Sequence, residues 1–594
     1  MELFHKTFAR YRTDALYVGL LLIAAGIVFY TNLDSYSLHN WDEGNYAHIA
    51  RFMLQEGNWL IPYSYYPGYG SVVYRPFLEK PPLLLWLQAI SIAILGASET
   101  AIRLPAATAS LLTTTVVYVF GRMLANRRTG LFAGMVYLTI PFVYLGNNSG
   151  RFGTTDALLV FFGSLFVLFM WRFVRAETPI VRRRSLYLAA LTAAFAFLSK
   201  GVAAGIYLVV LAPFIVIHWR VVVYDWWPIS KSLFTALIVA FTWPAFAYAA
   251  RTDVFERFFI EEQVLQRLAG ETGPASDGTF TFMQYPYFRE LLTSTDPWGI
   301  LFLPAIFYVV YRGVRGVIAS RLDSDAQVTS TDGGQLKAHD HDWLFIAWWA
   351  VAVYVFFMFT GNLAWYLLPM YVPLALVVGR LLADASIWRM GALAAFAAGV
   401  LLVGAFSYRF LWNSLLSARF ARINAINSSA LGGLRFTLAF AGLVIGVLTA
   451  RPLAKFTKRH LSLAVQRITL ERGCYAIGAF IVVIALVRTP TGLTDSEYNT
   501  AQDHLGTAAD DATPASTTIY LSENATAETP FYSFAFYAGR RVDDATSAEL
   551  ASDTDIQYAV ITESELSDIN RSANVLARGA NRPRTDIVLV EFSP

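Results

Sequence analysis

The sequence predicts a mainly α-helical, polytopic membrane bundle with a small α/β domain at its C-terminal end. Hydrophobic residues make up 56% of the 594 positions, whereas charged residues make up only 15%. The apolar residues lie in long runs, such as 15–33 and 431–450. Runs of about 20 apolar residues match the thickness of a bilayer core, so these runs predict membrane spans. The segment after about residue 490 lacks such a run, which predicts a separate domain outside the bilayer.

The first apolar run, 15–33, is predicted to be a retained span. Lys6, Arg10 and Arg12 precede it, and no small-residue cleavage site follows it, which argues against a signal peptide. Basic flanks favour the cytoplasm, so the N-terminus is expected inside. The single cysteine, Cys474, excludes an intrachain disulfide framework and a thiolate metal cluster.

Later apolar segments predict the other helices of the bundle. They lie near 81–96, 104–124, 130–147, 157–174, 186–198, 202–219, 232–250, 296–311, 343–360, 364–383, 388–408, 431–450 and 473–489. If all of them crossed, the basic runs at 127–128 and 182–184 would face outside. That arrangement contradicts the bias of Lys and Arg towards the cytoplasm, so one segment is expected not to cross.

Segment 81–96 is the one predicted to stay at the membrane surface. It is short, opens with Pro81-Pro82 and closes at Gly96, which favours a juxtamembrane helix over a span. The alternative is that 186–198 fails to cross instead. Without 81–96 the bundle has about thirteen spans, with the C-terminus outside. The long external loops are then 34–103 and 251–295.

Residues 491–594 are predicted to form an acidic, extracytoplasmic α/β domain, and residues 1–490 to form the transmembrane domain. The predicted strands are Thr518–Leu521, Gln557–Thr562 and Ile587–Phe592. Helical segments are expected at Ala548–Ala551 and Ser564–Val575. The polar, Ala- and Thr-rich stretch 495–516 is predicted to be a linker.

The first external loop carries two groups of polar residues beside the predicted membrane surface. The loop opens with Asp42-Glu43, and later contains Glu79-Lys80 immediately before Pro81. A solvated acidic pair that marks the start of the loop is the structural alternative for Asp42 and Glu43. Ordinary interfacial anchoring is the alternative for Lys80.

Several stretches of this region together resemble a known group of enzymes. Asp42-Glu43 with "EGNYAHIARFMLQEGNWLIP", "FLEKPPLLLWLQA" and "ETAIRLPAATASLL" is similar to the protein O-mannosyltransferase and lipid A aminoarabinose transferase group. The similarity extends over roughly the first 380 residues. It implies a GT-C glycosyltransferase that takes a sugar from a polyprenyl phosphate on the outer face. It also implies that Asp42 is the catalytic carboxylate.

The chemistry of such a transfer agrees with the residues of this loop. The phosphate is already a good leaving group, so the reaction needs a base for the acceptor hydroxyl and cations for the departing phosphate. Asp42 suits the base, with Glu43 as a further catalytic carboxylate, and Lys80 suits the phosphate. Tyr46 and Glu79 are expected to line the substrate pocket.

Two further charged residues are expected at the outer ends of spans. Asp156, in "NNSGRFGTTDALLVFF", lies at the predicted outer end of a span, where burying a carboxylate is costly. It matches a second acidic residue of the group. The alternative is that Asp156 caps the N-terminus of the helix that follows. Lys200, in Ser199-Lys200-Gly201, interrupts an apolar stretch and predicts a turn between two spans. The resemblance implies that this turn lies near the donor phosphate, and a plain hairpin turn is the alternative.

The loop "FERFFIEEQVLQRLAGETG" offers another phosphate ligand, Arg267, whose alternative is a surface ion pair with Glu262. Gln263 stands where the related proteins often carry His, so no metal site is predicted, and a divalent cation is left open. The stretch "GNLAWYLLP" resembles the Tyr-x-Leu-Pro signature of the group, and its Tyr366 is a candidate pocket residue or an interface aromatic.

The leading hypothesis is an inverting hexosyl or pentosyl transferase that uses a dolichyl-type or other polyprenyl phosphate sugar, with mannose as the expected hexose. Its acceptor would be a protein, a lipid-linked glycan or an envelope lipid outside the membrane. No Gly-rich phosphate loop or Walker pattern predicts a nucleotide, and no nucleic acid partner is expected. The alternatives are a flippase for a lipid-linked sugar and a non-catalytic scaffold.

Overall fold

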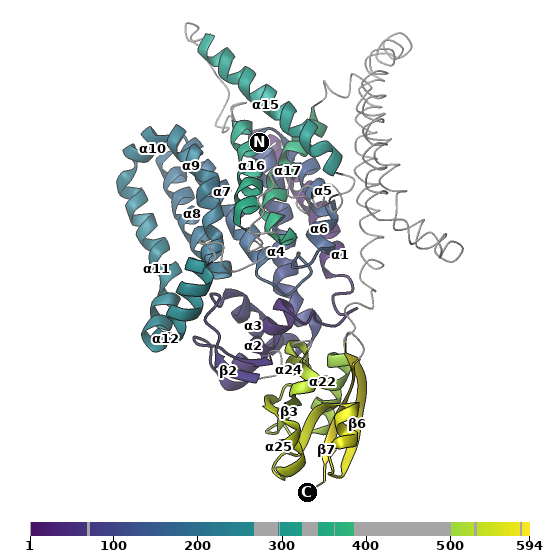
Figure 1. The fold of residues 1–594 in the computed structure, drawn as a ribbon. Helices are drawn as coiled ribbons and strands as arrows, with labels where there is room; N and C mark the ends of the chain where they lie inside the picture. Colours follow the sequence, from purple (N-terminus) through teal and green to yellow (C-terminus); the bar gives the residue numbers. More distant parts are fainter. Residues whose placement is uncertain are drawn as a thin grey trace, which may run out of the picture.

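The computed structural model describes residues 2–67, 72–266, 298–322, 342–360, 363–384, 501–527, 531–581 and 585–593, together with Leu291 and Thr295. A helical bundle forms most of this part of the chain, and the C-terminal domain lies at one end of it (Figure 1). The predicted spans 388–408, 431–450 and 473–489 and the predicted domain boundary at 490 lie outside the described residues. The count of thirteen spans therefore stays a prediction.

The bundle is built from long apolar helices. Seven helical stretches of the described residues are long and apolar enough to cross a membrane. The bundle helices are α1 (Glu2–Tyr30), α4 (Glu99–Leu124), α5 (Arg127–Thr139), α6 (Pro141–Leu145), α7 (Asp156–Arg175), α8 (Pro179–Lys200), α9 (Ile206–Ile217), α10 (Trp219–Tyr224), α11 (Trp226–Ala250), α12 (Thr252–Phe255), α15 (Gly299–Leu322), α16 (Asp342–Thr360) and α17 (Leu368–Ala383). These helices confirm the prediction of a multi-span membrane protein.

The packing of the bundle separates buried helices from lipid-facing ones. Residues 367–379, which include most of α17, are all buried against neighbouring helices. In contrast, α9 and α11 expose large apolar side chains, such as Leu208 at 61% and Phe234 at 66%. A soluble protein would not present such faces to water. They are suited to the hydrocarbon of a bilayer, which has no polar groups to offer.

Helix α3 (Leu83–Leu95) is the segment that was predicted not to cross the membrane. It has 13 residues, and at 1.5 Å per residue it is about 20 Å long, shorter than the hydrocarbon core. It packs on α2 and α4 near the end of the bundle that carries the C-terminal domain (Figure 1). Ile90 and Ile94 are exposed on its outer side. This geometry agrees with a juxtamembrane helix.

The end of the bundle far from the C-terminal domain carries ion pairs between neighbouring helices. Arg127 Nε lies 2.9 Å from Asp14 Oδ1, and Arg182 Nη1 lies 3.1 Å from Asp225 Oδ2 beside α10 (Figure 1). Arg175 pairs with Asp342 there as well. The basic loops that were predicted to share one side of the membrane therefore do lie at one end.

The first external loop folds into a compact layer at the opposite end. Helix α2 (Asp42–Glu56) ends at Gly57, which adopts the left-handed conformation with φ 73°. The hairpin of β1 (Tyr63–Pro67) and β2 (Val72–Pro76) follows, and α3 completes the layer. The apolar face of α2 packs against α3 and the start of α4, so the loop forms a continuous core with the bundle.

The C-terminal domain contains a five-stranded sheet in the order β4-β3-β5-β7-β6. Strand β3 is parallel to its two neighbours, and β7 is antiparallel to both of its own. The strands are β3 (Thr518–Ser522), β4 (Arg541–Ala545), β5 (Tyr558–Thr562), β6 (Ala573–Asn581) and β7 (Thr585–Phe592), and the helices are α22 (Ala501–Ala512), α23 (Glu523–Thr526), α24 (Tyr532–Ala538), α25 (Ser547–Ser552) and α26 (Glu563–Asp568). The three predicted strands and the helix near 548–551 are confirmed.

Two predictions for this domain were wrong. The predicted linker 495–516 contains helix α22, whose Leu505 and Ala509 are fully buried in the domain core. The predicted helix Ser564–Val575 ends at Asp568, and Ala573 begins strand β6. Both errors concern segments whose structure depends on distant partners: α22 packs on α24, and β6 pairs with β7.

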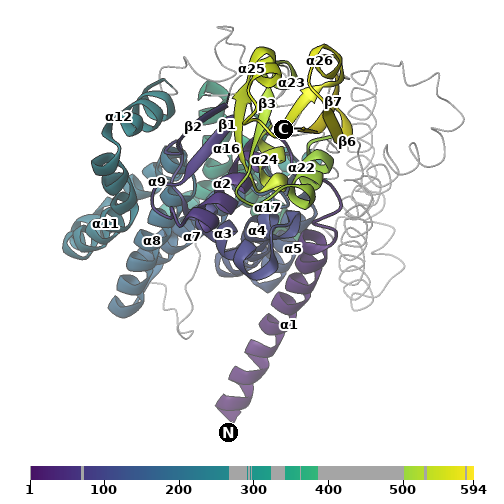
Figure 2. The ribbon, with the colours of Figure 1, turned by 90° about the horizontal axis from the view of Figure 1, so that it is seen from below.

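The C-terminal domain docks directly on α2 (Figure 2). Arg51 of α2 donates a hydrogen bond of 3.1 Å to the carbonyl of Tyr537 and forms an ion pair of 3.1 Å with Asp510. Phe52 of the same helix joins the core of the domain. Gly539 has φ 56°, and a Cβ at this position would lie 2.1 Å from the Arg51 guanidinium. The sequence is therefore adapted to this close contact.

Candidate functional site

Four of the predicted site residues come from element ends that meet at the end of the bundle next to the C-terminal domain. Asp42 begins α2, Asp156 begins α7, and Lys200 ends α8. Lys80 lies three residues before α3. Lys200, Asp42 and Lys80 all lie close enough to the Asp156 carboxylate to act on it electrostatically, and Lys200 contacts it directly.

Asp156 and Lys200 form a buried ion pair. The Lys200 Nζ donates a hydrogen bond to Asp156 Oδ1, and the two side chains are only 10% and 6% exposed. Thr155, not Asp156, precedes the helix as its N-cap, and no side-chain cap is formed there. The Asp156 carboxylate therefore pairs with Lys200 and does not cap α7. Gly201, with φ 61°, provides the predicted turn.

Tyr366 lies against the same lysine. Its ring centroid is 5.4 Å from Lys200 Nζ, within the range of a cation–π contact. The 3₁₀ turn η3 (Ala364–Leu367) carries Tyr366, and the Phe357 ring packs on Tyr366 with ring centroids 5.1 Å apart. The late span and the end of α8 therefore meet at Lys200, and the role of Tyr366 as a pocket residue stays a prediction.

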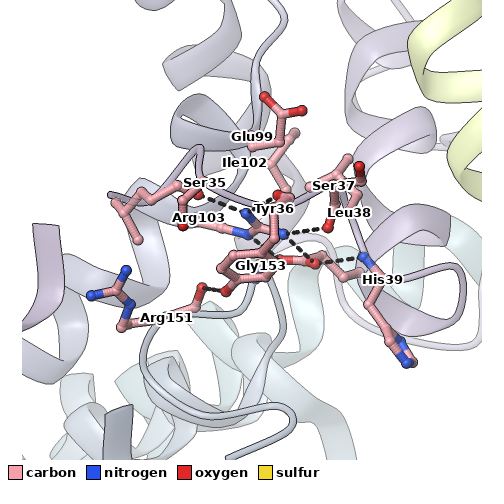
Figure 3. Close-up of polar contacts among 12 residues, drawn as sticks. Ser35, Tyr36, Ser37, Leu38, His39, Glu99, Ile102, Arg103, Arg151 and Gly153 are labelled. Atoms are coloured by element: carbon pink, nitrogen blue, oxygen red, sulfur yellow. Dashed lines mark hydrogen bonds and ion pairs between the residues drawn. The ribbon is translucent and has the colours of Figure 1, made fainter. Parts of the chain in front are cut away.

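Asp42 and Glu43 are adjacent in sequence but differ completely in environment. Asp42 is exposed, and no hydrogen bond to its carboxylate is formed by the described residues. The Glu43 side chain has no exposed surface and pairs with Arg103 through Oε1 to Nε at 2.8 Å and Oε2 to Nη2 at 3.0 Å. The backbone N–H groups of His39 and Gly153 also donate to Glu43, each at 2.8 Å (Figure 3).

The prediction of a catalytic role for Glu43 does not agree with this geometry. Burial raises the pKa of the Glu43 carboxyl, but the Arg103 guanidinium and the donated hydrogen bonds outweigh burial and hold the pKa below its ordinary value. Glu43 is thus a permanent carboxylate whose two oxygens are already bonded. It holds the loop in place, and only Asp42 of the pair faces outward.

Arg103 is the most important residue that the sequence analysis overlooked. It is fully buried and donates to the carbonyls of Leu33, Tyr36 and Ser37 as well as to Glu43 (Figure 3). Its guanidinium carbon also lies 3.8 Å from the Tyr36 ring centroid. An arginine at the end of an apolar span that the sequence predicts to be outside runs against the positive-inside bias, and this signal could have identified it.

Lys80 and Glu79 lie beside the π-helical segment η2 (Glu256–Leu265). Lys80 Nζ donates to Gln263 Oε1 at 2.6 Å. Glu79 accepts a hydrogen bond of 2.8 Å from Arg75, whose guanidinium stacks 3.6 Å from the Phe258 ring centroid. Gln263, which replaces the histidine expected from the resemblance, is therefore a hydrogen-bond partner of the candidate phosphate-binding residue Lys80.

Two other predicted site residues are Tyr46 and Arg267. Tyr46 is only 4% exposed and packs edge-on against Phe77 in the core, so it does not line an open pocket. Arg267, the third predicted phosphate ligand, lies outside the described residues. Among the described residues, no group of three or more His, Cys, Asp or Glu side chains could hold a metal ion.

Comparisons with known proteins agree with this arrangement. Residues 79–245 match the family described as dolichyl-phosphate-mannose-protein mannosyltransferase. An undecaprenyl phosphate-alpha-4-amino-4-deoxy-L-arabinose arabinosyl transferase of Shewanella sediminis is 28% identical over 351 residues, which cover 57% of this chain and 55% of that protein. A protein of the same description from Pseudomonas aeruginosa is 27% identical over 370 residues, 61% of this chain and 59% of that protein. The chain thus matches little more than half the length of these relatives.

The fold resembles solved structures over almost the whole chain. The crystal structure of ArnT from Cupriavidus metallidurans bound to undecaprenyl phosphate has a TM-score of 0.61 at 18% identity, covering 97% of this chain and 98% of that one. The same protein in the apo state has a TM-score of 0.63. The sequence motifs, the family match and this fold agree in what the chain resembles: it is a multi-span membrane protein that is similar over residues 79–245 to dolichyl-phosphate-mannose-protein mannosyltransferases, similar in sequence to aminoarabinose transferases, and similar in fold to ArnT.

Proposed function

We propose that the protein transfers a sugar from a polyprenyl phosphate to an acceptor hydroxyl outside the membrane. The observation that carries this proposal is the meeting of an exposed carboxylate, Asp42, with Lys80 and the Asp156–Lys200 pair. A base for the acceptor and cations for the departing phosphate are the two requirements of such a transfer. Both are present at one end of the bundle.

In the proposed reaction Asp42 removes the proton of the acceptor hydroxyl as the oxygen attacks the anomeric carbon. The bond between that carbon and the phosphate oxygen breaks, and polyprenyl phosphate leaves. A single displacement inverts the anomeric configuration. Lys80 and Lys200, with Arg267, stabilise the charge that the phosphate gains. Asp156 orients Lys200, and the Tyr366 ring restricts the position of the same ammonium group.

The donor sugar is proposed to be a hexose such as mannose or a pentose such as aminoarabinose, and the acceptor a protein, a lipid-linked glycan or an envelope lipid. The family match favours a mannosyl donor, whereas the relatives named above favour an aminoarabinosyl donor. The side of the membrane is proposed from the basic loops: Arg127 and Arg182 lie at the cytoplasmic end, and Asp42 lies at the outer end.

The test uses purified protein in proteoliposomes with labelled polyprenyl phosphate sugars, mannosyl and aminoarabinosyl in parallel. The expected result is label on an added acceptor and release of polyprenyl phosphate. Movement of intact labelled lipid between leaflets without transfer would support a flippase and refute the proposal. Absence of both activities with every donor would also refute it, provided that the protein remains folded in the membrane.

Replacement of Lys80 by Met is expected to weaken donor binding. The substitution keeps the apolar stem but removes a charge-assisted contact to phosphate, so the KM for the donor should rise about 10- to 100-fold. The matched control is Lys231→Met, since Lys231 lies near the start of α11 at the other end of the bundle, 4.9 Å from the Trp227 ring centroid. An unchanged donor KM in Lys80→Met would remove Lys80 from the phosphate site.

A further inference from the structure

The chain segment that immediately precedes Asp42 is held by the C-terminal domain. Asn40 Oδ1 accepts hydrogen bonds from the Ser533 backbone N–H at 3.1 Å and from its hydroxyl at 3.2 Å. The Leu38 N–H donates to the Tyr537 hydroxyl at 2.9 Å. Both Ser533 and Tyr537 belong to α24, which packs on α2 (Figures 1 and 2).

These hydrogen bonds are buried, so the C-terminal domain and the loop share a buried interface. Asn40 is 6% exposed and Ser533 is not exposed at all. The Ser533 hydroxyl also contacts Gln502 of α22 at 2.8 Å, and Gln502 is itself fully buried. A buried polar group that loses its hydrogen-bond partner is disfavoured, so the bonds between Asn40 and Ser533 favour one position of the segment.

Gly44 allows the close approach of α24 to the start of α2, because it has no side chain. It lies two residues after Asp42 in the first turn of α2. A Cβ at Gly44 would lie 3.0 Å from the Ser533 backbone nitrogen and 3.1 Å from the His39 carbonyl oxygen. A side chain at this position would require α24 or the His39 carbonyl to move by a few tenths of an ångström.

Tyr537 connects this segment to the bundle. Its hydroxyl accepts from Leu38 N–H and donates to Glu99 Oε1 at 2.8 Å. Glu99 is the first residue of α4, the helix that also carries Arg103. The segment before Asp42 is therefore fixed from two sides: Arg103 and Glu43 hold it from within the bundle, and α24 holds it from outside.

From these contacts we infer that the C-terminal domain positions Asp42 for catalysis through Ser533 and Tyr537. The inference rests on the proposed function. Because none of the described residues bonds the Asp42 carboxylate, its position is set by the backbone of residues 37–41, which the domain holds. The domain is thus part of the active site, although neither residue touches the reacting groups. A small displacement of a catalytic group is enough to reduce the rate.

The test is Tyr537→Phe in the full-length protein in proteoliposomes. Loss of one hydroxyl that bonds two groups should lower kcat about tenfold. The donor KM should stay within about twofold, since Lys80 and Lys200 lie on other elements. The matched control is Tyr558→Phe, which removes a hydroxyl bond of similar length, 2.9 Å to Glu591, within the C-terminal domain and away from the loop. The control should keep the wild-type kcat.

A double variant separates positioning from a general loss of stability. If Tyr537 acts through Asp42, Tyr537→Phe should have no further effect on kcat in an Asp42→Asn background. Asn40→Ala should reproduce the fall in kcat, and Asn40→Asp, which retains the accepting oxygen, should restore most of it.

The outcomes distinguish the two proposals. A normal kcat in both Tyr537→Phe and Asn40→Ala, with Asp42→Asn inactive, would overturn the positioning role and leave the proposed function intact. Equal losses in Tyr537→Phe and Tyr558→Phe would also overturn it, because they would indicate a general effect on the domain. An inactive wild type would instead overturn the proposed function.

Discussion

Replacement of Asp42 by Asn is expected to lower kcat by about 10²- to 10⁴-fold, the usual contribution of a general base. The amide has nearly the same shape but cannot take the proton of the acceptor hydroxyl. Since Asp42 is exposed and unbonded among the described residues, the fold should survive the change. The measurement is kcat for sugar transfer in proteoliposomes, together with the thermal midpoint of the variant.

The matched control for this variant is Asp34→Asn. Asp34 is another exposed aspartate of the same loop, and it should keep full activity when it is replaced. Full activity in Asp42→Asn would assign the base elsewhere, and Asp156 would then be the next residue to replace. Equal losses in both variants would show that the loop is sensitive to any lost charge.

Replacement of Arg103 by Met is expected to destabilise the protein by about 3–5 kcal/mol, the cost of leaving a buried charge without its partner. The variant would leave Glu43 and the three carbonyls of Leu33, Tyr36 and Ser37 without their shared donor. The measurement is the unfolding midpoint of the purified protein in detergent, and transfer activity should fall with it because Asp42 is adjacent.

The matched control for Arg103→Met is Arg578→Met, because Arg578 pairs with Glu563 on the surface, where the side chains are 59% and 46% exposed. An exposed pair contributes at most about 1 kcal/mol. A wild-type midpoint in Arg103→Met would contradict the structural role of the buried pair.

The same pair predicts how stability depends on pH. The pKa of Glu43 is held below its ordinary value of 4.5, chiefly by Arg103, against the opposing effect of burial. A carboxyl with a depressed pKa contributes stability that is fully present above its ordinary pKa and is lost as the pH falls through the folded-state pKa. The thermal unfolding midpoint should therefore decrease as the pH is lowered below about 4.5. Glu43→Gln should make the midpoint less dependent on pH.

The sequence alone identified the residues of the candidate site but not the environment of each one. Asp42, Lys80, Asp156 and Lys200 could be identified because charged residues at the ends of apolar segments are costly and stand out. Glu43 could not be told from Asp42 in this way. Successive residues of a helix point about 100° apart, so one side chain faces outward while the next faces the core. Tyr46 lies three residues after Glu43 and shares its inward face.

The same distinction holds for the fold as a whole. Apolar runs, their lengths and their basic flanks were enough to predict the bundle, the short helix α3 and three strands of the C-terminal domain, because a bilayer and a pleated sheet impose simple periodic rules. Only the tertiary structure decided that Arg103 pairs with Glu43, that Gln263 binds Lys80, and that α24 holds the segment before Asp42. These contacts join residues between 60 and 499 positions apart. They depend on which elements meet in space, and local sequence patterns carry no information about that.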